Sequence, residues 1–109
     1  MKVTVLGSGS AGNATLVEAD GVRILVDAGF SGRDLERRLR AVGTDPASLA
    51  AIVITHEHGD HTRGMGVLAR RFGVPLALTP ITRRACARLL TGAERVLEYA
   101  SARPFRIGP

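Results

Sequence analysis

The stretch AIVITHEHGDH, residues 51–61, decides both the fold and the chemistry of this chain. Its first five residues form an apolar, mostly β-branched run that is typical of a buried strand. The next six contain every histidine of the sequence, His56, His58 and His61, together with Asp60. Imidazole and carboxylate groups are ligands that zinc and similar divalent ions prefer. The sequence therefore predicts a metal-binding loop at the carboxyl end of a strand, where open α/β sheets usually bind ligands.

The spacing of these side chains favours two ions rather than one. In an extended segment, residues two apart point the same way, so His56 and His58 are expected to bind one ion. Gly59 turns the chain, and Asp60 and His61 are then expected to face a neighbouring ion. Such an arrangement suits a two-metal site, in which the ions lie roughly 3.5–4 Å apart.

The loop differs from the helical H-E-x-x-H motif of the metalloproteases. His58 and His61 are three residues apart rather than the four of that motif, and Gly59 disfavours a helix here. Glu57 lies between two ligands and is expected to point away from the ions. The alternative is a polar surface loop whose histidines cluster by chance, but three histidines with an intervening aspartate favour metal binding.

Outside the loop, strand and helix patterns alternate as in α/β proteins. Ser31 is expected to cap a helix with an apolar stripe of Leu35, Leu39 and Val42, and Gly43 to end it. A later helix is expected to end at Gly73. We expect strands at residues 2–6, 14–18, 22–26, 51–55, 75–78 and 96–99, helices at 31–42, 67–72 and 79–90, and the start of another strand at 105–107.

The glycine-rich loop at residues 7–12, GSGSAG, matches the pattern G-x-G-x-x-G of dinucleotide-binding folds, and Asp27 follows at about the right distance. That fingerprint requires a helix after the glycines, because the helix N-terminus holds the pyrophosphate. Residues 14–18 instead have the pattern of a strand. We therefore predict no dinucleotide site, and we expect the glycines to let the backbone pass close to the metal loop or the substrate.

The motif and its surroundings resemble a known family. His-x-His-x-Asp-His after a hydrophobic strand is similar to the signature of the metallo-β-lactamase-fold hydrolases. Residues 3–13, 24–29 and 61–70 are similar to the YycJ/WalJ-like branch of these enzymes. The resemblance covers the chain from Met1 to about Thr79.

The resemblance implies an α/β protein, the N-terminal half of a metallo-β-lactamase-type αβ/βα sandwich. Residues 1–109 are thus expected to be a partial domain whose C-terminal half is absent. In the resembled family, a histidine after a later strand, a bridging aspartate and a final histidine complete the site, whereas the motif here already uses all three histidines. The turn signal at residues 108–109 also agrees with truncation. A naturally short protein is the alternative.

For the complete enzyme, the resemblance implies hydrolysis assisted by two divalent metal ions, most simply zinc, with manganese as the alternative. The ions lower the pKa of a bridging water towards about 7 and provide a hydroxide nucleophile. His56 and His58 are expected to bind the first ion, and Asp60 and His61 the second. Asp60 is also the predicted catalytic residue, because it can accept a hydrogen bond from the nucleophile.

Four further residues have two interpretations each. Asp27 ends an apolar strand, and the resemblance implies that it orients groups of the metal loop from beneath; the alternative is a cap for the helix near Ser31. Ser8, Ser10 and Asn13 lie in the glycine-rich loop, which borders the active site in the resembled family. They are predicted to donate to substrate oxygens, or else to form a structural turn.

The resemblance implies a phosphodiester substrate, namely nucleic acid such as single-stranded DNA ends. β-Lactam and thioester substrates belong to other branches of the fold and are compatible with the motif. The alternative is an inactive half-domain or a nucleic-acid-binding module without turnover. Metal-dependent turnover that a chelator abolishes separates the two hypotheses.

Composition is that of an ordinary globular protein, with 45% hydrophobic and 23% charged residues. The sequence contains no run of about 20 apolar residues and no signal-peptide pattern, so we expect a cytoplasmic protein without a membrane partner. The single Cys86 fits a reducing compartment and is expected to be a buried structural thiol. A half-sandwich also leaves an apolar face open, so a homo-oligomer is a further expectation.

The formal net charge is +5, and every basic residue except Lys2 is an arginine. A strongly basic chain is compatible with a polyanionic partner such as nucleic acid. Ordinary solvated helix faces give the same composition, so charge alone leaves the partner open.

Overall fold

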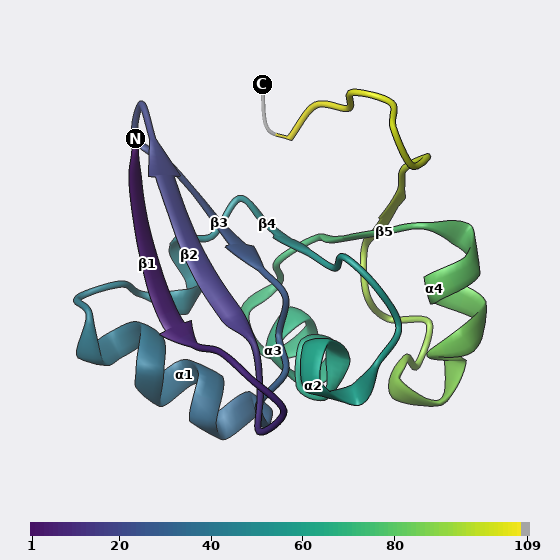
Figure 1. Cartoon of the computed structure of the whole chain (residues 1–109), viewed down its shortest axis with the longest axis horizontal. Helices are drawn as coiled ribbons and strands as arrows, with labels where there is room; N and C mark the ends of the chain where they lie inside the picture. The colour runs from purple at the N-terminus through teal and green to yellow at the C-terminus, as the bar shows by residue number, and fades with distance from the viewer. Residues whose placement is uncertain (108–109) are drawn as a thin grey trace.

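A computed structural model describes residues 1–107. These residues form one mixed α/β unit in which strands and helices alternate (Figure 1). The elements are β1 (Lys2–Gly7), β2 (Ala14–Ala19), β3 (Val22–Val26), α1 (Gly32–Ala41), a 3-10 turn (Pro46–Ser48), β4 (Ala51–Val53), α2 (Gly59–Thr62), α3 (Met65–Phe72), β5 (Leu76–Leu78), α4 (Pro80–Ala85), a second 3-10 turn (Ala87–Leu89) and β6 (Val96–Glu98).

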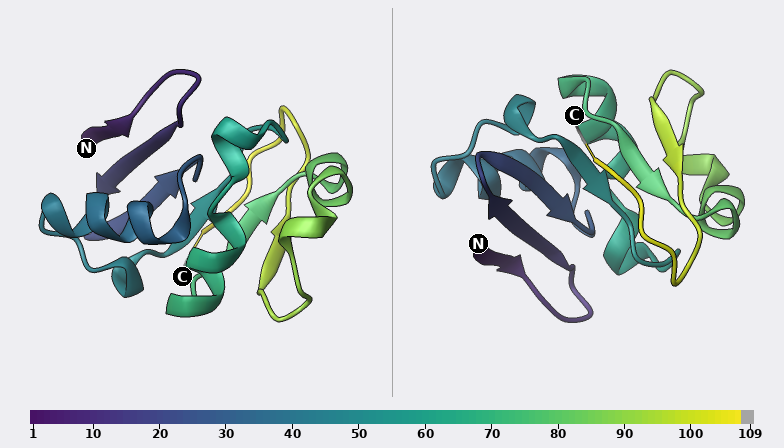
Figure 2. Two further views of the ribbon diagram at one scale, coloured as in Figure 1. Left: turned by 90° about the horizontal axis from the view of Figure 1, so that it is seen from below. Right: turned by 90° about the horizontal axis from the view of Figure 1, so that it is seen from above.

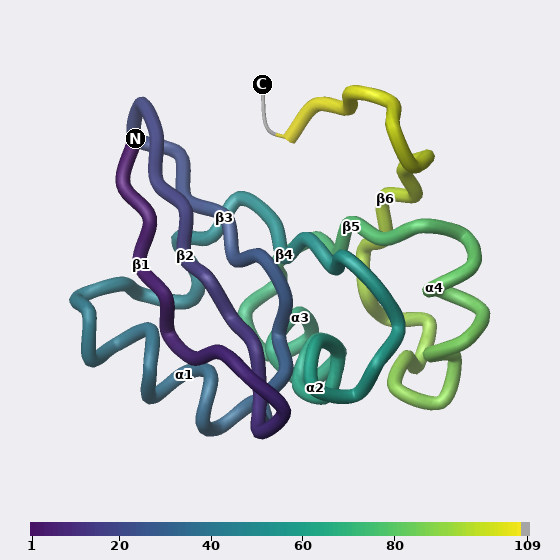
Figure 3. The backbone as a smooth tube through the Cα atoms, viewed as in Figure 1, coloured from purple at the N-terminus to yellow at the C-terminus, as the bar shows by residue number. Residues whose placement is uncertain are grey.

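The six strands lie in the sheet in the same order as in the sequence, from β1 to β6. β1, β2 and β3 pair antiparallel, whereas β3 to β6 pair parallel through helical crossovers. Asp20 and Gly21 make the two-residue turn between β2 and β3, with φ angles of 51° and 77°. The carboxyl ends of the central parallel strands β3 and β4 therefore lie at one end of the sheet, together with the β1–β2 loop (Figure 3).

The helices α1 and α3 cover one face of the sheet, and the segment after β6 crosses the other face (Figure 2). The core lies between the sheet and these helices, where Leu16, Leu25, Leu35, Leu39 and Ile52 are at most 1% exposed. On the other face of the edge strand β1, Val3 and Val5 remain 55% and 62% exposed. At the β1 edge, one face of the sheet is thus packed and the other carries exposed apolar side chains, whereas consecutive residues of β5, Leu76–Leu78, are all buried.

Several sequence predictions are confirmed. The side chain of Ser31 accepts a hydrogen bond from the backbone N–H of Asp34 at 3.2 Å and caps α1. Gly73 ends α3 in the left-handed conformation, with φ of 65°. β2 follows the glycine-rich loop directly, as expected from the strand pattern of residues 14–18. Cys86 is buried.

Other predictions need correction. The expected strand at residues 51–55 pairs as a strand only to Val53, because the chain then turns into the metal loop. The expected helix at residues 79–90 breaks at Cys86, whose buried side chain turns towards the carbonyl oxygen of Glu57. Residues 105–107 form no strand, since the Phe105 ring stacks on Tyr99 with the ring centroids 4.6 Å apart.

The ends of two helices also differ from expectation. Val42, predicted to belong to the apolar stripe of the first helix, follows its last turn and is 43% exposed. Gly59 does not prevent helix formation: it begins the single turn α2, in which the N–H of Arg63 donates to the carbonyl oxygen of Gly59 at 3.0 Å. A lone turn needs few bonds, and the Thr62 hydroxyl stabilises it by donating to the His58 carbonyl at 3.1 Å.

Candidate metal centre

The ligand loop, residues 55–62, leaves β4 and enters α2. His56 and His58 precede the helical turn, with His58 as its N-cap, and Asp60 and His61 lie on the turn itself. The backbone N–H of His61 donates to the carbonyl oxygen of His58 at 2.9 Å. The four predicted ligands are therefore held by one compact segment rather than by an open loop.

Asp27, at the end of β3, orients His61. Its carboxylate oxygen Oδ2 lies 2.7 Å from Nδ1 of His61. A carboxylate only accepts hydrogen bonds, so Nδ1 carries the proton and the lone pair of Nε2 is left for another partner. This tautomer is the one that a metal ligand binding through Nε2 requires.

Thr55 shares the same carboxylate. Its backbone N–H and its hydroxyl donate to Asp27 at 2.8 Å each, and the hydroxyl also lies 3.1 Å from Nδ1 of His56. Asp27 is only 6% exposed, and these donors satisfy it. Sequence reasoning missed Thr55, although a hydroxyl residue at the end of an apolar run was a visible signal. The alternative prediction, in which Asp27 caps the helix, is wrong, because Ser31 caps it.

Asn13 joins the glycine-rich loop to Asp60. Its backbone N–H donates to the carbonyl oxygen of Asp60 at 2.8 Å. Its side-chain nitrogen Nδ2 lies 3.2 Å from Oδ2 of Asp60, 3.3 Å from Nε2 of His61 and 2.8 Å from the carbonyl oxygen of Gly9. The amide of Asn13 thus points towards the predicted ligands.

Ser8 and Ser10 lie in the exposed part of the same loop. Within residues 1–107, the hydrogen bonds of this loop come from Gly9, Gly12 and Asn13 rather than from the serine hydroxyls. Their predicted contact with substrate oxygens stays a prediction.

Gly29 allows three backbone segments to meet behind the loop. Its N–H donates to the carbonyl oxygen of Asn13 at 3.0 Å, and the neighbouring N–H of Ala28 donates to that of His61 at 2.8 Å. A Cβ atom on Gly29 would lie 1.8 Å from the carbonyl oxygen of Asp60. Only glycine permits this approach.

The imidazole rings of the ligand loop lie close together. The ring centroids of His56 and His58 are 4.9 Å apart, and those of His56 and His61 are 3.8 Å apart. Among residues 1–107, no three His, Cys, Asp or Glu side chains have the arrangement that holds a metal ion. The donor set nevertheless fits a divalent ion in its chemistry, because imidazole nitrogens and a carboxylate are ligands that such ions take.

The thiol of Cys86 supports the backbone of the ligand loop. The thiol of Cys86 lies 3.5 Å from the carbonyl oxygen of Glu57, and burial raises the pKa of this thiol. A buried thiol of raised pKa is a poor nucleophile and a structural group. The side chain of Glu57 is exposed.

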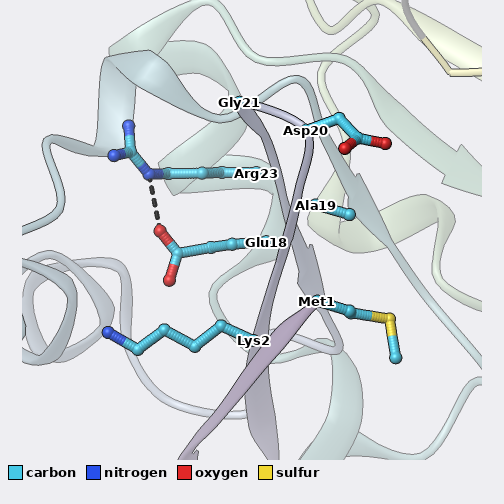
Figure 4. Close-up of a pocket in the computed structure, with 7 residues that line it drawn as sticks. All are labelled: Met1, Lys2, Glu18, Ala19, Asp20, Gly21 and Arg23. Atoms are coloured by element: carbon cyan, nitrogen blue, oxygen red, sulfur yellow. Dashed lines mark hydrogen bonds and ion pairs between the residues drawn. The ribbon is translucent and has the colours of Figure 1, made fainter.

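A shallow pocket of about 320 Å³ lies at the opposite end of the β1–β3 hairpins (Figure 4). An ion pair of 2.8 Å between Arg23 and Glu18 forms one wall. The pocket is lined by Met1, Lys2, Glu18, Ala19, Asp20, Gly21 and Arg23. None of the predicted ligands lines it.

The sequence model of the metallo-beta-lactamase superfamily matches residues 7–106. The chain belongs to this superfamily. It is 47% identical over 75 residues to exodeoxyribonuclease WalJ of Streptococcus pneumoniae, which covers 69% of this chain and 28% of the relative. It is 39% identical over 87 residues to exodeoxyribonuclease YycJ of Bacillus anthracis, with 80% and 33% coverage. The predicted YycJ/WalJ-like resemblance is confirmed, and the chain spans about a third or less of these relatives.

Solved structures confirm the predicted fold class. A metallo-β-lactamase of Cronobacter sakazakii superposes with a TM-score of 0.69 at 25% identity, covering 79% of this chain and 35% of that one. The subclass B3 enzyme MEM-A1 from a soil metagenome gives 0.78 at 19% identity, covering 98% and 46%, and shows the fold alone. The chain therefore forms part of a metallo-β-lactamase-type α/β sandwich. No helix among residues 1–107 is long and apolar enough to cross a bilayer.

Proposed function

We propose that this chain contributes the ligand loop of a metal-dependent phosphodiesterase that acts on nucleic acid. The observation that carries the proposal is the hydrogen bond from Nδ1 of His61 to Asp27, because it prepares Nε2 to bind a metal within the family's own motif. The relatives named exodeoxyribonuclease support a nucleic-acid substrate. A ribonuclease Z of Mycobacterium marinum, 41% identical over 73 residues, supports the same class.

In this proposal, His56 and His58 hold a first divalent ion, and Asp60 and His61 hold a second. When bound, the two ions, zinc or alternatively manganese, supply an acidified water as the nucleophile. Asp27 keeps the proton of His61 on Nδ1. Asp60, whose carboxylate is restrained by the amide of Asn13, is directed to accept a hydrogen bond from the attacking water.

The proposal includes the expected partial domain at residues 1–109. All four proposed ligands come from one loop, and the chain covers 28% of WalJ. We propose that groups outside this chain complete the coordination of the two ions. The isolated chain is then expected to bind zinc or manganese weakly and to show little turnover.

The alternative is an inactive half-domain or a nucleic-acid-binding module. It is favoured by the absence, within residues 1–107, of three ligand side chains that already converge. Both hypotheses allow the chain to bind nucleic acid, but only the hydrolase requires a metal for turnover.

The deciding experiment measures metal content and cleavage of a labelled single-stranded DNA in the parent enzyme. We expect His58→Ala to lower metal content and rate together, and Asp60→Ala to abolish cleavage. Ser10→Ala is expected to retain its metal and to lose at most one substrate hydrogen bond, worth about 0.5–1.5 kcal/mol. Glu57→Gln, in the same loop, is the control. Unchanged metal content and cleavage in Asp60→Ala would disprove the second ion site.

We also propose a cytoplasmic location and self-association of the isolated chain. A nucleic-acid substrate supports the first. The exposed valines of β1 support the second, because an apolar sheet face and an open strand edge favour association with another copy.

A further inference from the structure

Two arginines flank the ligand loop. Arg63 follows α2 directly, and Arg33 is the second residue of α1, whose N-terminal end lies beside α2 (Figure 1). Both residues are exposed. Neither arginine is one of the predicted metal ligands.

The backbone just after Arg63 is in contact with the backbone just before Arg33. Gly64 donates its N–H to the carbonyl oxygen of Ala28 at 2.9 Å. A Cβ atom on Gly64 would lie 2.2 Å from the carbonyl oxygen of Phe30 and 2.9 Å from the nitrogen of Gly32. The residues that precede Arg33 and follow Arg63 thus pack against each other, so the two exposed arginines are attached to neighbouring parts of the backbone.

The acidic groups on α1 are already paired with other arginines. Asp34 pairs with Arg37 and Arg38, and Glu36 pairs with Arg40 and Arg71, all on α1 or α3. In residues 1–107, neither Arg33 nor Arg63 belongs to an ion pair.

The orientation of the Asp60 side chain explains why Arg63 has no ion-pair partner among the residues that the structure describes. The two residues are three apart on α2, a spacing that allows side chains to meet. However, the Asp60 carboxylate is turned towards Nδ2 of Asn13 at 3.2 Å and lies 3.7 Å from Nε2 of His61. The group that would neutralise Arg63 is thus directed into the candidate metal centre.

The position of Arg33 in the first turn of α1 does not stabilise the helix. The N-terminus of a helix has a partial positive charge, so a cation in the first turn is disfavoured there. The basic residues Arg38 and Arg40 lie in the last turn of α1, where the macrodipole favours them. An unpaired cation at the wrong end of the helix is instead suited to bind an external anion.

We propose that Arg33 and Arg63 form a phosphate-binding surface that holds a single nucleic-acid strand beside the ligand loop. The inference rests on the proposed function, because the strand is the substrate of that loop. Guanidinium groups bind phosphate oxygens without reading bases, so the surface positions the strand and adds no sequence preference.

The test is the salt dependence of binding between the purified chain and a fluorescent oligothymidine, followed by anisotropy. The slope of log K against log salt is negative, and each lost phosphate contact reduces its magnitude by about 0.7 for a single strand. The double variant Arg33→Ala/Arg63→Ala should therefore reduce the magnitude of the slope by about 1.4. The double variant Arg33→Lys/Arg63→Lys should retain the slope. The matched control is Arg37→Ala/Arg83→Ala, which removes two exposed but ion-paired arginines and should change the slope much less.

Circular dichroism first confirms that each variant is folded. Equal slopes for the wild-type chain and the Arg33→Ala/Arg63→Ala variant would overturn the surface, as would a wild-type chain that does not bind the oligonucleotide at low salt. Cleavage by the metal-loaded parent enzyme is measured separately. An altered slope without any cleavage overturns the proposed function alone, whereas cleavage with an unaltered slope overturns the phosphate-binding surface alone.

Discussion

Asp27 and His61 lie 34 residues apart in the sequence and meet in a hydrogen bond of 2.7 Å between Oδ2 and Nδ1. Asp27 terminates the central strand β3, whereas His61 lies on the single turn α2. The orientation of this imidazole is therefore determined by the sheet as well as by its own loop. Thr55 strengthens the link, because it donates to the same carboxylate from the start of the ligand loop.

Replacing Asp27 by Asn should weaken metal binding by about 10- to 100-fold, the usual effect of losing a group that orients a ligand. Asn tolerates the φ of 65° at this position, so the change removes the charge and one acceptor while sparing the backbone. Zinc affinity is measured by competition with a chromophoric chelator. The control is Asp20→Asn, the same substitution at a φ of 51° in the turn between β2 and β3. Equal zinc affinities of the two variants would contradict the role of Asp27.

Replacing Gly29 by Ala should destabilise the chain by more than the roughly 1–3 kcal/mol typical of an overpacked site. The added methyl would overlap the backbone carbonyl of Asp60, which cannot rotate away. Gly59→Ala provides the comparison, since a Cβ atom there meets nothing within 4 Å and alanine favours the helical turn. Urea unfolding curves measure both. A Gly29→Ala variant as stable as Gly59→Ala would show that the three backbone segments are not tightly held.

Acid should weaken the fold through Glu94. Burial raises the pKa of this carboxyl, but hydrogen bonds from Arg70 and from nearby backbone N–H groups outweigh it and lower the pKa from 4.5 to about 2. A carboxyl of depressed pKa stabilises the folded state above its unfolded pKa, and this contribution is lost as the pH falls from about 4.5 to about 2. Glu94→Gln should therefore lower the free energy of unfolding at pH 7. The difference from the wild-type chain should disappear towards pH 2, and a difference that is independent of pH would contradict this origin.

Self-association of the isolated chain should depend on the open face of β1. Val5→Lys places a charge on a side chain that is 62% exposed and should shift the chain towards monomer in light scattering. Ile81→Lys changes an equally apolar residue, 67% exposed on α4, and should leave the distribution unchanged. A wild-type chain that is monomeric at high concentration would contradict the prediction.

Local patterns were sufficient to predict most of the fold. The β-branched runs, the Ser31 cap and the left-handed Gly73 depend on neighbouring residues, and each was visible in the sequence. The break at Cys86 was not predictable, because it depends on a contact with Glu57, 29 residues away. The same limitation explains the strand wrongly expected at 105–107, where the Phe105 ring packs on Tyr99.

In the candidate site, too, residues with local signals could be predicted, and those that depend on distant contacts could not. Its four ligands and Asp27 were predicted from residue types, spacing and family resemblance, and their roles stay predictions. The amide of Asn13 reaches Asp60 across 47 residues, a contact that no local pattern indicates. Thr55 and the arginine pair at positions 33 and 63 likewise gain their significance only from packing.

The order of the strands has a consequence for folding kinetics. Every strand pairs with its nearest neighbour in the chain, from β1 to β6, so sheet formation never has to bring distant segments together before nearer ones. The antiparallel pairs join nearby residues such as Ala19 and Val22, whereas the parallel pairs join distant ones such as Ile24 and Ala51, so the hairpins are expected to form first. The antiparallel β1–β3 hairpins offer an edge on which β4 can then dock. We therefore expect Asp27 to be in position before the ligand loop folds, so that His61 would meet a preformed hydrogen-bond acceptor.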